Sequence, residues 1–179
     1  MAKAEKLMTF IHKWEGGFAN NPNDGGGCTM RGITLSTYRD YYGRHKTCND
    51  LKYITDEEWL HIFKDGYWDI CRADEINSQI VANIIVDWAW MSGVKTAVKK
   101  VQKILNVDAD GIIGKNTLYA INKCNEEILF NDIYNERVKF YTNIVENKPS
   151  QKIFLNGWLN RLNDIDTHEM KTVKITSKN

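Results

Sequence analysis

Residues 78–92 form the most apolar stretch of the chain, and this stretch constrains the fold more than any other part of the sequence. Drawn as a helix, it carries apolar side chains on every face: Ile80, Val81, Ala82, Ile84, Ile85, Val86, Trp88, Ala89, Trp90 and Met91. A helix that is apolar all round is buried in the centre of a domain. Asn83 and Asp87 are the polar exceptions, four residues apart on one face. We therefore expect a protein that packs around this helix.

Periodicity and capping signals predict further helices on both sides of this core. Residues 2–14 have apolar side chains at helical spacing. Thr34 is predicted to cap a helix that runs to Tyr42. Thr55, with Glu58 three residues later, forms a capping box for a helix that ends near residue 66. Other helices are expected over 94–105, from about 116, over 126–145 and around 154–162.

Strand patterning is confined to the residues before Thr34. Residues 28–33 are predicted to form the short strands of a hairpin that bends at Gly32. The fold class that follows is mainly α with a small β-hairpin element.

Charge and composition exclude several functions. The formal net charge is only +1, whereas a general nucleic-acid binder needs a large positive field. No stretch is long and apolar enough to span a bilayer. The first six residues are polar and lack the apolar core of a signal peptide. We therefore expect a protein made in the cytoplasm that reaches any external target after release or non-classical export.

The cysteines and histidines are scattered along the chain and show no metal-ligand spacing. Without a signal peptide, reduced thiols are the expectation, so we predict that all four cysteines are reduced and dispensable for catalysis. No metal and no cofactor are implied. The residues concerned are Cys28, Cys48, Cys71 and Cys124, and His12, His45, His61 and His168.

A candidate catalytic constellation follows the first predicted helix. Glu15 ends that helix before two glycines, Asp24 lies in a glycine-rich turn, and Thr29 lies on the predicted hairpin. The negative end of a helix dipole favours a protonated carboxyl, which suits a proton donor. Glycosidic hydrolysis uses such a donor with a second carboxylate, and a Thr hydroxyl can hold water. Taken alone, an acidic residue at a helix end is commonly a solvated surface group, and an Asp before Gly is commonly a turn former.

A longer motif includes these residues. Glu15-Gly16-Gly17-Phe18, followed by residues 24–34, Asp-Gly-Gly-Gly-Cys-Thr-Met-Arg-Gly-Ile-Thr, resembles the signature of glycoside hydrolase family 108. Tyr67-Trp68-Asp69 and residues 87–93 resemble later pieces of the same family, with Met91 where Asn is usual. This resemblance implies a lysozyme-like N-acetylmuramidase with Glu15 as general acid, Asp24 as second carboxylate and Thr29 as a water holder.

The second half of the chain resembles a predicted peptidoglycan-binding domain. The similarity rests on Asp110-Gly111-Ile112-Ile113-Gly114 with Thr117, and on Gly157-Trp158-Leu159-Asn160-Arg161. We expect a catalytic region over 1–93, a peptidoglycan-binding helical region over 94–163 packed with it into one compact body, and a flexible tail over 164–179. The resemblance implies a phage-related, bacteriolytic hydrolase of the endolysin kind. Its partner is the peptidoglycan glycan strand, reached with a holin or a dedicated export system.

Three residues have open assignments. Tyr67 and Trp68 are predicted either as core residues or as sugar platforms. Asp87 is predicted either to accept hydrogen bonds from buried backbone or Trp N–H groups, or to line the sugar cleft. We favour the first of these roles. Two rival functions stay open: a lytic transglycosylase on the same substrate, and a non-catalytic wall-binding or secretion-accessory protein.

Overall fold

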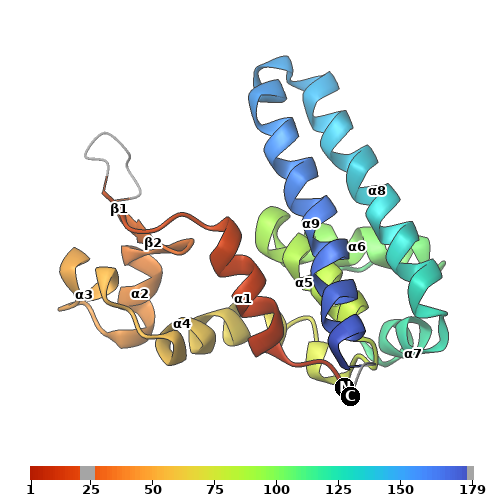
Figure 1. The fold of residues 1–179 in the computed structure, drawn as a ribbon, viewed down its shortest axis with the longest axis horizontal. Helices are drawn as coiled ribbons and strands as arrows, with labels where there is room; N and C mark the ends of the chain where they lie inside the picture. The colour runs from red at the N-terminus through yellow and green to blue at the C-terminus, as the bar shows by residue number, and fades with distance from the viewer. Residues whose placement is uncertain (21–26, 177–179) are drawn as a thin grey trace. The chain divides into compact units, whose positions relative to one another are not determined.

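The computed structural model describes residues 1–20 and 27–176, and the side chains of those up to residue 165 (Figure 1). The chain divides into two compact units. We call Ala4–Gly66 the N-terminal unit, and Met1–Lys3 together with the chain from Tyr67 onward the C-terminal unit. The described residues are mainly helical and contain one small antiparallel sheet, which confirms the predicted fold class.

The N-terminal unit contains four helices and three short strands among its described residues. In chain order they are α1 (Ala4–Trp14), β1 (Ala19–Asn20), β2 (Cys28–Met30), β3 (Ile33–Thr34), α2 (Leu35–Tyr42), α3 (Cys48–Lys52) and α4 (Asp56–Phe63). Thr34 and Thr55 cap α2 and α4 as predicted, and Glu58 completes the capping box. The five-residue helix α3 was not predicted, because it is too short to show helical periodicity.

The sheet has the strand order β1-β2-β3, and both pairs are antiparallel. Met30 pairs with Ile33, which leaves Arg31 and Gly32 as a two-residue turn. Their φ angles are 49° and 78°, and two positive φ angles in succession suit the twist of a tight hairpin. The predicted hairpin and its bend at Gly32 are therefore confirmed. Strand β1, which pairs with β2, adds an edge that the sequence pattern did not show.

The cysteine prediction is wrong for one pair. Cys28 at the start of β2 and Cys48 at the start of α3 form a disulfide, with their Cα atoms 5.9 Å apart. Strand β2 packs against α3, so the fold brings together two thiols that lie 20 residues apart in the sequence. Cys71 and Cys124 are free thiols, the first buried and the second exposed.

The boundary between the units falls within a π-helix. Helix α4 is followed by η1 (Lys64–Trp68), so helical structure continues past residue 66, where we expected it to end. Such wide turns occur frequently at functional sites. This one contains Tyr67 and Trp68.

The C-terminal unit is built around α5 (Gln79–Ser92), whose residues 81–89 are all buried. Helix α5 packs against α6 (Val94–Ile104), α8 (Glu126–Asn147) and α9 (Lys152–Thr176). The unit also contains α7 (Lys115–Lys123) and the short 3-10 helices η2 (Ala73–Glu75) and η3 (Pro149–Gln151). The predicted central helix is confirmed. Helix α9 extends well beyond the expected end near residue 162.

Candidate functional site

Glu15 lies at the C-terminal end of α1. Its N–H donates to the carbonyl of Ile11 at 2.8 Å, which extends the helical bonding by one residue, and its side chain is half-buried. The buried face of α1, which includes Leu7 and Phe10, anchors the helix.

The backbone after Glu15 is open. Gly16 and Gly17 are exposed. Apart from their chain neighbours, no described atom lies within 4 Å of where a Cβ would stand on either glycine. The absence of side chains there leaves room for a bulky ligand to approach the carboxyl group.

Arg31 connects the hairpin turn to two helices. Its N–H donates to the carbonyl of Gly16 at 3.2 Å, directly after Glu15. The Arg31 carbonyl accepts from Trp59 Nε1 at 2.9 Å, and its guanidinium contacts the carboxylate of Asp56 at 2.5 Å. The turn of the sheet, the end of α1 and the start of α4 are thereby fixed to one another.

His12 lies in the same cluster, one turn of helix before Glu15. Its ring meets the ring of Trp59 edge-on, with the centroids 4.5 Å apart. Its Nε2 is buried and has no hydrogen-bond partner among the described residues. Burial, and then the charge of the Arg31 guanidinium, lowers the pKa of His12 below its ordinary value, while Asp56 acts in the opposite direction. His12 therefore stays neutral near pH 7 and serves as packing beside Trp59.

Thr29 lies on the central strand β2, opposite Ala19 on β1 and Thr34 on β3. Neighbouring strand residues point to opposite faces, and Cys28 is completely buried. Thr29 therefore lies on the other face of the sheet, where it is half-buried. The disulfide anchors one end of β2, and Arg31 follows at the other end. Asp24, the predicted second carboxylate, lies outside the described residues.

Phe18 was part of the sequence motif, but no role was assigned to it. It lies three residues after Glu15, just before β1, and it is 37% exposed. The ammonium group of Lys52 lies 5.9 Å from the centre of its ring. An exposed aromatic ring close to the acid in the sequence is the signal that could have marked it as a sugar platform.

Tyr67 and Trp68 have different environments in the C-terminal unit. Tyr67 is half-buried and packs against the half-buried ring of Trp90, with the centroids 4.8 Å apart. Trp68 has no exposed surface, and its Nε1 donates to the carboxylate of Asp74 at 2.7 Å. Tyr67 and Trp90 thus keep part of their ring surface accessible, whereas the geometry of Trp68 fits core packing.

Asp87 lies in the core of the C-terminal unit. Arg137 from α8 donates to its Oδ2 at 3.0 Å, and Arg161 from α9 donates to its Oδ1 from Nη2 at 2.7 Å and from Nε at 3.0 Å. Arg137 also donates to the hydroxyl of Tyr141 at 2.9 Å. With Asp87 and Arg137 fully buried, the arrangement joins α5, α8 and α9 and leaves the carboxylate no surface to offer a sugar.

Two kinds of feature are absent from the described part of the chain. No three His, Cys, Asp or Glu side chains gather there as a metal ion would require. Nor does any helix of that part have the length and apolar character to cross a bilayer.

Comparison with known proteins finds two domains. Residues 8–93 match the family model Glycosyl hydrolase 108, and residues 96–163 match the model Predicted Peptidoglycan domain. The first match crosses the boundary between the two structural units and ends just after α5. No curated protein sequence matches the chain significantly.

One similar solved structure is described as "Structure of Brucella abortus SagA". It is 29% identical in sequence, its TM-score is 0.75, and the match covers 94% of each chain. The likeness thus extends over both units of this chain.

Proposed function

We propose that this chain, which belongs to glycosyl hydrolase family 108, acts as an N-acetylmuramidase. It also carries a predicted peptidoglycan domain. The two domains make it a glycoside hydrolase that acts on peptidoglycan. The bond we assign is the β-1,4 linkage between N-acetylmuramic acid and N-acetylglucosamine. The observation that carries this proposal is the position of Glu15, at the end of a helix with a buried face and beside open glycine backbone.

In the proposed mechanism Glu15 is the general acid. It transfers its proton to the glycosidic oxygen as the bond from that oxygen to the anomeric carbon breaks. The anomeric carbon then carries positive charge in an oxocarbenium-like transition state. A second carboxylate either stabilises this charge or activates the attacking water. We assign that role to Asp24. Water attacks the anomeric carbon and gives up one proton to a carboxylate of the site, so the chain is cut with a new reducing end.

Thr29 is proposed to hold the attacking water. Its hydroxyl can accept a hydrogen bond from water and donate one to a carboxylate. Strand β2 is tied at one end to Cys48, and the turn that follows is tied to Gly16, so the backbone that carries Thr29 has little freedom to move. For sugar contacts we propose Phe18 in the N-terminal unit and Tyr67 with Trp90 in the C-terminal unit.

The domain assignment, 1–93 catalytic and 94–163 peptidoglycan-binding with a tail over 164–179, remains part of the proposal. We place the site of action outside the cytoplasm, where peptidoglycan lies. The Cys28–Cys48 disulfide supports this, because disulfides persist in oxidising compartments. Release by a holin or a dedicated export system remains a prediction, as does an endolysin-like role.

The decisive test replaces Glu15 with Gln, which keeps the size of the side chain but cannot donate a proton. Hydrolysis of purified peptidoglycan should fall by at least about 100-fold, the lower range of what general acid catalysis contributes. Glu5→Gln is the matched control, because Glu5 is an exposed glutamate at the other end of α1. Its activity should equal that of the wild type.

Mass spectrometry of the products tests the chemistry. A muramidase leaves reducing N-acetylmuramic acid ends, whereas a lytic transglycosylase leaves anhydro ends. Anhydro products would show that a hydroxyl of the sugar itself, and not water, attacks the anomeric carbon. Wild-type clearing by Glu15→Gln would remove Glu15 from the mechanism, and a wild-type protein that binds without cleaving would point to a wall-binding role.

A further inference from the structure

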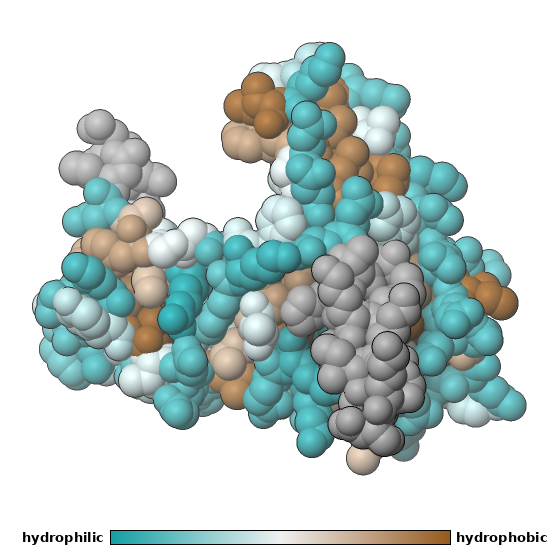
Figure 2. All heavy atoms as spheres, in the orientation of Figure 1, coloured by the Kyte–Doolittle hydropathy of each residue, from teal (hydrophilic) through white to brown (hydrophobic). Residues whose placement is uncertain are grey.

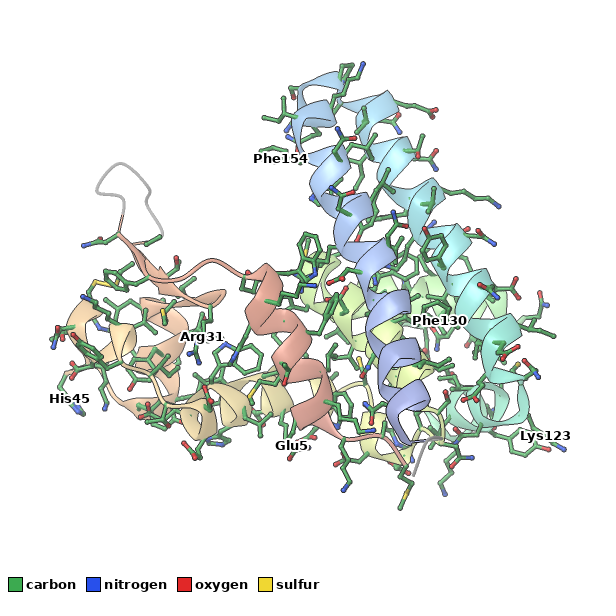
Figure 3. All side chains as sticks on the ribbon, viewed as in Figure 1. Glu5, Arg31, His45, Lys123, Phe130 and Phe154 are labelled. Carbon is green, nitrogen blue, oxygen red and sulfur yellow. A yellow bond between two sulfur atoms is a disulfide. The ribbon has the colours of Figure 1, made fainter. Side chains whose placement is uncertain are left out.

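Three aromatic rings form a continuous stack between α8 and α9. Phe154 stacks on Trp158 with the centroids 6.0 Å apart and the planes 26° apart, and Trp158 lies 5.4 Å and 32° from Tyr141. Exposure rises along the stack, from a buried Tyr141 through a half-buried Trp158 to Phe154 at 49%. Figure 3 places Phe154 near the end of the α8–α9 hairpin, where Figure 2 shows an apolar patch.

Gly157 leaves the helix surface bare beside this stack. It lies inside α9, where glycine is the least suitable residue except proline. Residues three apart are neighbours on a helix surface, so Gly157 adjoins Phe154. Apart from its chain neighbours and the backbone of its own helix, no described atom lies within 4 Å of where its Cβ would stand. Packing within the described chain therefore does not require a glycine here.

We propose that Phe154, Trp158 and the bare backbone at Gly157 form a glycan subsite in the C-terminal unit that binds a sugar ring of the peptidoglycan strand. The apolar C–H face of a sugar stacks on an accessible aromatic ring, and a missing side chain lets the sugar lie close to the helix. This inference rests on the proposed function for its ligand. It locates binding within the stretch that matches the peptidoglycan domain.

The charges around the stack suit the same ligand. Lys148 and Lys152, both exposed, lie just before Phe154 in the chain. Peptidoglycan carries carboxylates on its stem peptides, close to the sugars. Lys148 follows the end of α8 and Lys152 begins α9, so both cations lie at the turn of the same hairpin and would attract these carboxylates while the ring binds the sugar face.

A second copy of the chain fits this patch poorly. A phenylalanine side chain contributes roughly 150–250 Å², so a half-exposed Phe154 together with Ile153 offers on the order of 200–300 Å² of open apolar surface. Each partner in a stable dimer buries about 800 Å². The patch is the size of a sugar contact and too small for a dimer interface.

The test measures binding without cleavage, in the Glu15→Gln background, by sedimentation with purified peptidoglycan. Phe154→Ala should weaken binding about ten-fold, as loss of one stacking contact implies. Gly157→Gln should weaken it at least as much, because the new side chain occupies the space beside the ring. Gln forms helices better than Gly, so this variant should melt no lower than its parent.

Two controls separate the subsite from a general surface effect. Asn156→Gln introduces the same side chain on the opposite side of α9, because residues two apart do not face each other. Tyr119→Ala removes another exposed ring, on α7. Both should bind like the parent protein.

The possible results have distinct meanings. Unchanged binding by both Phe154→Ala and Gly157→Gln would overturn the proposal. So would Phe154-dependent flotation with anionic phospholipid vesicles, or Phe154-dependent dimers in light scattering. Cleavage of a short soluble glycan fragment, assayed with Glu15 intact, reports separately on the proposed function. A protein that binds through Phe154 but does not cleave would contradict only the muramidase assignment.

Discussion

Replacing both Cys28 and Cys48 with serine removes the covalent link between β2 and α3. The disulfide closes a loop with a sequence separation of 20 residues. In the chain-entropy treatment, opening a loop of this length increases the entropy of the unfolded chain, which is worth about 3 kcal/mol at room temperature. Because Cys28 is completely buried, the polar hydroxyl that replaces its sulfur adds to the loss. We expect the free energy of unfolding of the N-terminal unit to fall by about 3 kcal/mol or more.

Urea unfolding combined with hydrogen exchange measures this effect and shows where it acts. The midpoint should fall in the double variant and in wild type treated with reductant. Amide protection should fall in residues 28–30 and 48–52, while α5 in the C-terminal unit stays protected. Cys124→Ser is the control, because that thiol is free and exposed. Activity should fall as well, since β2 carries Thr29.

Alkylation of the thiols can refute the reasoning. Burial raises the pKa of Cys71 to about 12, so the native protein should react at Cys124 alone. The unfolded, unreduced protein should react at Cys71 and Cys124. Modification of all four cysteines without reductant, or an unchanged urea midpoint in the double variant, would show that the disulfide does not stabilise this fold.

Two further predictions concern buried charge. Asp87→Asn should lower the free energy of unfolding by about 3–5 kcal/mol in urea melts, because it leaves Arg137 and Arg161 buried without their counter-charge; a fall in turnover with unchanged stability would instead put Asp87 in the sugar site. The pKa of His12 is lowered in the folded protein, so its contribution to stability is complete above about pH 6.5 and is lost as pH falls below that value, where the unfolded chain takes up the proton first. His12→Phe keeps an aromatic ring beside Trp59 and should therefore flatten the dependence of the melting temperature on pH between 7 and 5; equal slopes in the two proteins would contradict this.

The sequence alone determined the features that depend on neighbours in the chain. The apolar stretch 78–92 had to be buried, because every face of its helix is apolar. Thr34 and Thr55 marked the starts of helices, since their hydroxyls bond to N–H groups three residues on. The position of Glu15 at a helix end followed from local signals too. These interactions span a few residues, so periodicity and motif spacing reveal them.

Only the tertiary structure decided which distant residues meet. Cys28 pairs with Cys48 because β2 packs on α3, and the spacing of the cysteines carried no sign of that contact. Asp87 meets arginines 50 and 74 residues further along, which makes it a core ion pair although its motif also suited a sugar cleft. Arg31 unites α1, the hairpin and α4 by the same kind of long-range contact. Such pairings depend on how helices and strands pack, and local patterns encode the elements without encoding their partners.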